Sequence, residues 1–242
     1  LNDTTNNEPV SDATVYMLWN NTIIPLSANG TVGFYEGALN VSGFSISTYD
    51  LEIYATTENH EFLGISVDII VTPIPTRILV QEGTTSLSVI YGDILGIYVE
   101  YNDTYYGGYL DGANVSYILG GYSASMSQLP DGRYYGEINS SLFSAQTLYL
   151  RVIARKDGYA QASRTQPFNI LAVPTDITAN VLTNDAYRGD MVNYTVYLND
   201  THTNAPITDA DVTIEWSGAT GTAYDLENGS YIISIFVNNS IP

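Results

Sequence analysis

The stretch Gly92–Thr104 reads GDILGIYVEYNDT, and it returns about 97 residues later as GDMVNYTVYLNDT in Gly189–Thr201. Both copies place a Gly-Asp turn signal before a run of alternating character and an Asn-Asp-Thr triplet after it. Alternation with a period of two is typical of a β-strand that buries one face. We therefore expect two similar domains, each with this face in its core. The residues of the face are Leu95, Ile97, Val99 and Tyr101 in the first copy and Val192, Tyr194, Val196 and Leu198 in the second.

The sequence around this strand repeats along the whole chain with a period of about 97 to 100 residues. The triplet also follows Leu1, and the turn DATV at Asp12–Val15 returns as GANV at Gly112–Val115 and as DADV at Asp209–Val212. A long period built of strand and turn signals indicates a string of similar domains rather than one enzyme. We divide the chain into residues 1–73, 74–173 and 174–242, and we expect the middle unit to be complete and the outer two to be partial.

Short runs rich in β-branched and aromatic residues alternate with turn signals in the middle unit, and no helical periodicity of useful length competes. This pattern predicts an all-β sandwich. The expected strands are 77–81, 87–91, 94–101, 113–119, 123–128, 133–138, 147–155 and 163–171. On the strand after the Asp111-Gly112 turn, the predicted inward residues are Val115, Tyr117 and Leu119. They align with Val15, Met17 and Trp19 in the first unit and with Val212, Ile214 and Trp216 in the third.

Both tryptophans thus share one repeat position, which resembles that of the buried tryptophan in immunoglobulin-type sandwiches. Tyr49 is a candidate tyrosine corner, although Leu148 stands at the corresponding place in the middle unit. With the Gly-Asp turns, the Asn-Asp-Thr triplets and the run Lys156–Tyr159, these features resemble the tandem immunoglobulin-like repeats of large archaeal cell-surface proteins. They resemble bacterial invasin-type arrays more loosely. The resemblance implies tandem immunoglobulin-like β-sandwich domains in an extended array, one complete and two partial, in a secreted stalk, surface layer or filament at the cell surface.

The charge balance narrows the range of partners. The chain has 26 acidic residues against 7 lysines and arginines, for a formal net charge of −19. Nucleic acids and anionic membranes both require a basic surface, so neither is an expected partner, and no segment reads as membrane-inserting. The absence of cysteine excludes disulfides and thiol catalysis.

Asn-x-Ser/Thr sequons are enriched. Independent placement of the 20 asparagines among the serines and threonines would produce about four sequons, and the chain has eleven. Turns and outward strand positions carry most of them, so we expect N-linked glycans on several. A competing interpretation is that Asn-Asp-Thr makes a good turn which duplication has copied. The acceptors are Asn2, Asn20, Asn29, Asn40, Asn102, Asn114, Asn139, Asn193, Asn199, Asn228 and Asn238.

Acidic residues recur in the loops that we expect beside the entry point of each unit. Oxygen ligands gathered at such a junction suit Ca²⁺, which takes six to eight of them and would stiffen the joint. The alternative is that these acids are solvated turn residues, and no other cofactor is indicated. The candidate ligands are Asp103, Asp111, Asp200, Asp209 and Asp211.

Positive charge is concentrated in the middle unit, which holds six of the seven basic residues, while residues 1–73 hold none. On the penultimate strand, Glu52 of the first unit aligns with Arg151 of the second, both on the outward face. Glu52 of one copy could therefore contact Arg151 and Arg155 of a neighbouring copy, because the charges are opposite. Because exposed ion pairs contribute little individually, scattered surface arginines are the simpler interpretation.

Two further functions can be compared with a structural role. Tyr105, Tyr106 and Tyr109 in one loop suit an adhesin-type module that recognises a glycan or a partner protein, although tyrosine is common in strands. Catalysis finds little support, since His60 and His202 lie in different units and outside any nucleophile or metal motif. We therefore expect no enzyme.

The leading hypothesis is a structural array in which each unit contacts its neighbours through a short, proline-stiffened linker. Its partners would be further repeats or copies of itself. Because both ends of the chain fall inside a repeat, we expect a segment of a longer chain. Completion of one outer unit by the other through strand exchange would leave surplus strands, since the middle strands of the repeat are present in both.

Overall fold

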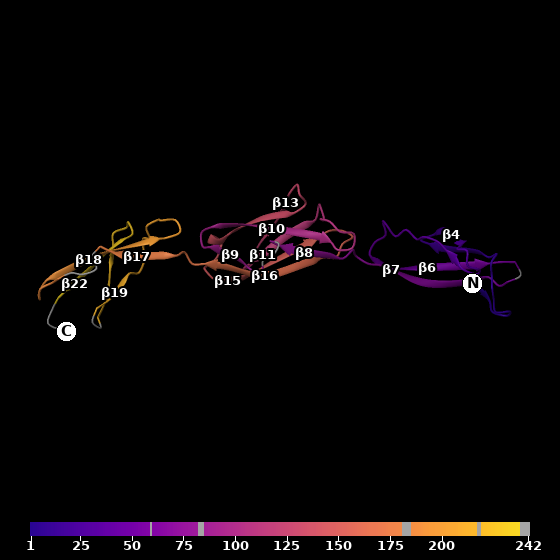
Figure 1. Ribbon diagram of the computed structural model, residues 1–242, viewed down its shortest axis with the longest axis horizontal. Helices are drawn as coiled ribbons and strands as arrows, with labels where there is room; N and C mark the ends of the chain where they lie inside the picture. The colour runs from indigo at the N-terminus through magenta and orange to yellow at the C-terminus, as the bar shows by residue number, and fades with distance from the viewer. Residues whose placement is uncertain (59, 82–84, 181–184, 217–218, 238–242) are drawn as a thin grey trace.

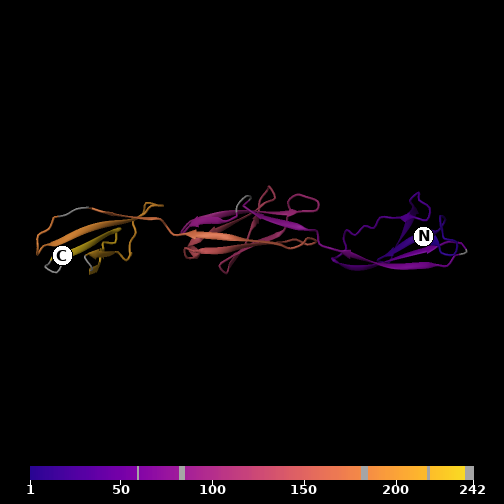
Figure 2. The same cartoon turned by 60° about the horizontal axis from the view of Figure 1, so that its bottom comes forward.

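The computed structural model describes all residues except 59, 82–84, 181–184, 217–218 and 238–242. Apart from one 3-10 turn, η1 (Ser140–Leu142), every regular element described is a β-strand. Three groups of strands lie end to end, with the N-terminus and the C-terminus at opposite ends of the molecule (Figures 1 and 2). The predicted all-β class is confirmed. The described residues contain no helix long and apolar enough to cross a bilayer.

The middle unit is a sandwich of two sheets. The four-stranded sheet has the strand order of the ABED sheet of an immunoglobulin domain, and the three central strands of the five-stranded sheet have the order of its CFG sheet, with one further strand at each edge. The predicted immunoglobulin-like fold is therefore confirmed. One sheet has the order β13 (Ser127–Gln128), β14 (Tyr134–Asn139), β10 (Ile94–Asp103) and β8 (Thr76–Val80). The other has the order β12 (Tyr122–Ser125), β11 (Asn114–Leu119), β15 (Thr147–Arg155), β16 (Ala162–Leu171) and β9 (Leu87–Ile90). Only β9 and β16 pair in parallel within these sheets.

The core of the middle unit lies between the two sheets, as the alternation predicts. On β10, Ile97, Val99 and Tyr101 are fully buried, and Leu95 packs against the same cluster. Across the core they face the predicted inward residues of β11, which are also buried. Buried residues of β15 and β16, in the same sheet as β11, complete the cluster. Each such side chain contributes about 1.5–3 kcal/mol through the apolar surface that it removes from water.

One predicted strand of the middle unit is wrong. Residues 123–128 do not form a single strand, because the chain changes sheets within them. β12 pairs with β11, whereas β13 pairs with β14 in the opposite sheet. Met126 lies at the crossing, buried in the core, and its amide donates to the Val115 carbonyl at 2.8 Å. Alternation of residue types does not show which sheet a strand joins.

Among its described residues, the first unit has the counterpart of the five-stranded sheet and not of the four-stranded one. Its order is β5 (Tyr35–Glu36), β4 (Thr22–Ala28), β3 (Thr14–Trp19), β6 (Ser47–Thr56) and β7 (Leu63–Val71), beside the short pair β1 (Asn2–Asp3) and β2 (Glu8–Pro9). Val15, Met17 and Trp19 are buried as predicted. In contrast, Val67 on the same face is 41% exposed, because no second sheet covers β7 in the described part of this unit.

The third unit has the counterpart of the other sheet. Its order is β17 (Thr175–Ala179), β18 (Met191–Asp200), β22 (Ser230–Phe236) and β21 (Tyr224–Asp225), with a separate hairpin of β19 (Thr213–Trp216) and β20 (Ala219–Thr222). Val192 and Val212 are buried, while Trp216 is only half-buried. Both outer units therefore contain a counterpart of the β11–β12 hairpin, in β3–β4 and β19–β20.

The buried side chain of Gln166 offers a test of how the core of the middle unit is packed. Gln166 on β16 is 3% exposed, and neither atom of its amide has a hydrogen-bond partner among the described residues. Val67 occupies the corresponding position of β7. An unpaired buried amide costs about 1–3 kcal/mol. We expect Gln166→Leu to raise the free energy of unfolding of the middle unit, measured by amide hydrogen exchange in β15. Unchanged or reduced protection would show that the amide is satisfied.

Candidate functional site: the joints between the units

The aspartate of each Asn-Asp-Thr triplet organises the loop that begins a joint. In every unit its Oδ1 accepts hydrogen bonds from the backbone amides two and three residues further on. Asp103 accepts from Tyr105 and Tyr106 at 2.7 and 2.8 Å, and Asp200 accepts from His202 and Thr203 at 2.7 and 3.1 Å. Asp3 makes the same pair of bonds to Thr5 and Asn6 at 2.8 and 3.3 Å. The triplet is thus a turn device that duplication has preserved.

The threonine of the triplet fastens the loop to the linker that enters the unit. Thr104 donates to the Pro75 carbonyl through its amide and through its hydroxyl, each at 3.0 Å. Thr201 binds the Pro174 carbonyl in the same way, at 2.9 and 3.1 Å. A linker held by two hydrogen bonds has fewer conformations than a free one. Each joint is therefore stiffened at the single chain segment that connects its two units.

A second loop of the middle unit holds the same linker from its other side. The Ile74 amide donates to the Gly158 carbonyl at 3.0 Å, and the Ala160 amide donates back to Ile74 at 2.8 Å. The Thr76 hydroxyl also donates to the Ala160 carbonyl, at 2.8 Å. The entry of the chain into the middle unit is therefore bonded on two sides, and the predicted turn at Asp157-Gly158 takes part.

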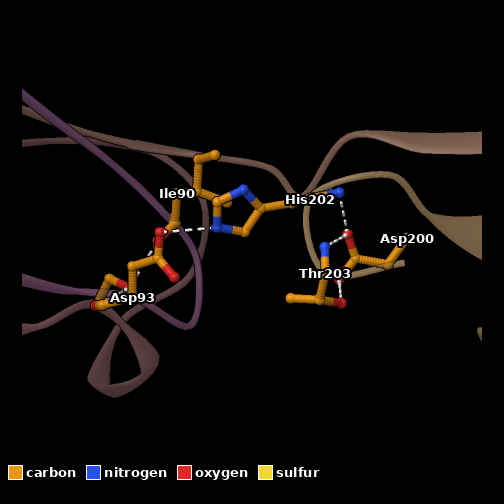
Figure 3. Close-up of polar contacts among 6 residues, drawn as sticks. Ile90, Asp93, Asp200, His202 and Thr203 are labelled. Carbon is orange, nitrogen blue, oxygen red and sulfur yellow. Dashed lines mark hydrogen bonds and ion pairs between the residues drawn. The ribbon is translucent and has the colours of Figure 1, made fainter. Parts of the chain in front are cut away.

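The joint between the middle and third units includes a direct side-chain contact, which Figure 3 shows. His202 Nε2 lies 3.0 Å from Asp93 Oδ2. Both groups are held in place, because the His202 amide is bound to Asp200 and the Asp93 carbonyl accepts from the Ser140 hydroxyl at 2.7 Å. The Gly-Asp turn of one unit thus meets the loop that follows the Asn-Asp-Thr triplet of the next.

A recurring tyrosine, which was not predicted from the sequence, closes the base of the same loop in all three units. Its hydroxyl donates to one backbone carbonyl and accepts from an amide three residues later. The bonds of Tyr134 are to the Leu110 carbonyl at 2.7 Å and from the Ala113 amide at 2.9 Å. Tyr35 and Tyr231 make the equivalent pairs, with Val10 and Ala13 and with Ile207 and Ala210.

A glycine two residues before each of these tyrosines allows the close approach. Gly132 has a φ of +87°, and a Cβ there would lie 3.0 Å from Tyr109. Its counterparts Gly33 and Gly229 have φ values of +82° and +80°, and a Cβ would meet Pro9 and Pro206. The recurrence of Gly-x-Tyr at about the repeat period is the sequence signal that identifies this device.

The predicted tyrosine corner occurs at Tyr49. Its hydroxyl donates to the Ser45 carbonyl at 2.9 Å, four residues upstream, and its ring packs 5.4 Å from Trp19. Hydrogen bonding to backbone a few residues upstream is the defining contact of that motif. Leu148 has no hydroxyl to repeat it in the middle unit.

The structure does not bring the calcium candidates together. Among the described residues there is no group of three or more histidine or acidic side chains placed to hold a metal ion. Asp103 and Asp200 bind their own loops, and Asp111 accepts from Gln128 Nε2 at 2.7 Å. Asp209 has a φ of +58° and donates its amide to Asp225, while Asp211 is exposed. Our proposed function therefore includes no calcium site.

Nine of the ten described sequon asparagines are exposed on the surface. Asn102 is half-buried, and its Oδ1 has no partner among the described residues. Asn238 lies outside the described residues. In four sequons, Oδ1 accepts from the amide of the sequon serine or threonine, at Asn29, Asn40, Asn139 and Asn228. The other exposed acceptors are Asn2, Asn20, Asn114, Asn193 and Asn199.

The proposed lateral contacts occupy equivalent places in their sheets. Glu52 lies opposite Leu18, and Arg151 lies opposite Ile118, so the predicted alignment is confirmed. Glu52 accepts a hydrogen bond from the Tyr54 hydroxyl at 2.8 Å, and Arg155 Nε donates to Gln161 at 2.6 Å. Arg151 is exposed on the outward face. The two histidines remain in separate units, and His60 Nε2 lies 3.7 Å from Asp3.

No family model and no curated protein matches the chain. Solved structures do match. Fibronectin(III)-like modules of CbhA from Clostridium thermocellum align at 17% identity over 68% of this chain and 80% of theirs, with a TM-score of 0.34. The adhesin InvE of Yersinia pseudotuberculosis aligns at 16% identity over 68% of this chain, with a TM-score of 0.32. Domains 4–9 of the surface layer protein SbsC align at 17% identity over 99% of this chain and 37% of theirs, with a TM-score of 0.30.

This chain spans about half, 51%, of the InvE structure. At these identities the likeness is one of fold. The matching structures are fibronectin(III)-like modules, an adhesin and a surface layer protein, the kinds of protein that the sequence resembles.

The pKa of Asp200 offers a test of the hydrogen bonds that hold the loop at the second joint. The Thr203 hydroxyl, which donates to Oδ2 at 2.6 Å, lowers the pKa of Asp200 below its ordinary value of 3.8, and the backbone amides of Thr203 and His202 add to the effect. A lowered folded-state pKa means that the contribution to stability is present at neutral pH and is lost as the pH falls through that pKa. We expect the His202 amide resonance to titrate below pH 3.8 and to stay flat in Asp200→Asn. A midpoint at or above 3.8 would contradict this.

Proposed function

We propose that this chain is a tension-bearing spacer in an extracellular repeat protein, extending a surface structure away from the cell. The observation that carries the proposal is the way the chain runs through the middle unit. It enters ahead of β8 and leaves after β16 at the opposite end, toward the neighbouring unit on each side (Figure 1).

The parallel pairing of β9 and β16 is suited to this role. Tension reaches β9 from its N-terminal side and β16 from its C-terminal side, in opposite directions along two strands that run the same way. Four residue pairs, from Leu87 with Phe168 to Ile90 with Leu171, are then loaded together rather than one after another. The Tyr91 amide adds a bond to the Leu171 carbonyl at 2.9 Å.

Single-molecule extension of the whole chain tests the proposal. We expect one event at higher force than the others, with a length release of about 3.3–3.6 Å for each residue of the middle unit. Tyr91→Pro removes the donor to Leu171 and should lower this force, whereas the control Tyr91→Phe keeps the backbone donor and should not. If the middle unit unfolds at no higher force than the outer sheets, the spacer role is wrong.

The sequons support an extracellular setting, because their number exceeds the random expectation and nine of the ten described are exposed. Copies of the chain and N-linked glycans are the partners that we propose. Lateral contact would use Arg151 and Arg155 of one copy and Glu52 of another. The proposed role requires no catalytic residue.

An adhesin-type role is the second candidate, and one loop favours it. Tyr105 and Tyr106 are 72% and 76% exposed, with ring centroids 4.7 Å apart, on a loop held by Asp103. Rings presented in this way can stack on a sugar face. A glycan array probed with the wild type and with Tyr105→Ala/Tyr106→Ala separates the two roles. Binding that the double variant loses would support the adhesin, and no binding by the wild type would exclude a glycan ligand within the array.

A further inference from the structure

The sequons at the joints occupy recurring positions. Asn139 and Asn40 have one place in the repeat, five residues after the tyrosine of Gly-x-Tyr. Asn199 and Asn102 have another, in the Asn-Asp-Thr triplet. In the fold, the first position lies at the end of a unit where the chain leaves it. The second lies at the end of the next unit where the chain enters. A joint between two units is therefore bordered by one sequon from each side.

The geometry of Asn139 places it beside the contact between the middle and third units. It is the last residue of β14 and lies opposite Ile94, the residue after Asp93. The hydroxyl oxygen of the next residue, Ser140, lies 2.7 Å from the Asp93 carbonyl and 2.9 Å from the Ile90 carbonyl, which share its one proton. Asn139 itself is exposed, and its bond from the Ser141 amide at 3.0 Å uses Oδ1 rather than Nδ2, the atom that carries an N-linked glycan.

Asn199 lies on the other side of the same contact. It precedes Asp200, whose carboxylate holds the His202 amide, and His202 reaches Asp93 (Figure 3). On β18 it lies opposite Asp176, two residues after Pro174 of the linker. Its side chain is exposed.

We propose that Asn139 and Asn199 carry a pair of N-linked glycans that flank this joint, limit its bending and shield the linker from proteases. The inference rests on the proposed extracellular function. At each site Nδ2 would form a bond to C1 of the first sugar of a lipid-phosphate-linked oligosaccharide. The lipid phosphate would leave, and Nδ2 would lose one proton.

Such glycans would act through their bulk. Residues 172–174 form the connection between β16 and β17, and the Pro174 carbonyl is held by Thr201. A large hydrophilic group on each side of the connection would restrict the tilt that brings the two units together and would obstruct a protease. The half-buried Asn102 makes the first joint a weaker case, so the proposal concerns the second joint only.

Secretion of the full chain from a host with N-glycosylation, followed by site-resolved mass spectrometry, tests attachment. We expect occupancy at Asn139 and Asn199. Ser141→Ala removes the first sequon while keeping Asn139 and the backbone amide that binds it, and Asn199→Gln removes the second. Asn114→Gln and Asn193→Gln remove sequons on β11 and β18 away from the joint and are the matched controls.

The role at the joint is measured by the rate at which a protease cuts residues 171–175. The double variant Ser141→Ala/Asn199→Gln should be cut several-fold faster than the glycosylated wild type, close to the rate of enzymatically deglycosylated chain. The two controls should not change the rate. An unoccupied Asn139 or Asn199 would overturn the proposal, as would equal cleavage of the double variant and the wild type. The force measurement above uses chain without glycans, so failure of the spacer role is seen separately.

Discussion

Tyr134→Phe is expected to lower the free energy of unfolding of the middle unit by about 2–3 kcal/mol. The substitution keeps the ring and removes only the hydroxyl, which leaves the Leu110 carbonyl and the Ala113 amide without their partner. Each buried backbone group left unpaired costs about 1–3 kcal/mol. Burial also raises the pKa of the Tyr134 hydroxyl, so the group remains a protonated donor at neutral pH.

Hydrogen exchange of β10 and β15 in the full chain measures this effect without relying on the tryptophans, which lie in the outer units. Tyr135→Phe is the matched control on the same strand. Its hydroxyl donates to the Glu137 carboxylate at 2.9 Å on the surface, so we expect a change within about 0.5 kcal/mol. Equal protection in the two variants would show that the buried tyrosine does not hold the loop.

Gly132→Ala should destabilise the same unit by about 2–3 kcal/mol. An alanine at a φ of +87° pays about 1–2 kcal/mol for its backbone conformation. The added Cβ would also lie 3.0 Å from two atoms of Tyr109, which must move. The loop between β10 and β11 would then shift from the position at which Tyr134 holds it.

Gly158→Ala separates the two terms of that cost. Gly158 has a φ of +80°, but a Cβ there would meet no atom within 4 Å. We expect it to cost only the backbone term, so the difference between the variants, followed by the same exchange measurement, isolates the contact with Tyr109. If Gly132→Ala and Gly158→Ala are equally destabilising, the close approach contributes nothing.

Much of the fold could be predicted from the sequence because burial of one strand face leaves a direct trace in residue type. Ile97, Val99 and Tyr101 occupy every second position of their strand, and all three are fully buried. The repeat then carries the same assignment to the other units. The split at Met126 could not be predicted in this way, since a strand that changes sheets keeps its alternation.

The joints were harder to predict. The sequence marks Asp103 and Asp200 as special without saying whether their carboxylates bind a metal or the backbone, and the structure shows backbone bonds. The contact of His202 with Asp93 joins residues far apart in the chain, and no local pattern announces it. The bridging hydroxyl of Tyr134 was likewise invisible among 21 tyrosines, although the glycine two residues before it recurs in each unit.

The threonine bonds to Pro75 and Pro174 have a geometric consequence beyond stiffness. A linker fixed to the loop of the following unit sets the rotation of that unit about the long axis as well as its tilt. Repetition of one such rotation along an array generates a screw. In an array of these units, surface groups at equivalent positions would follow a helical path around the axis.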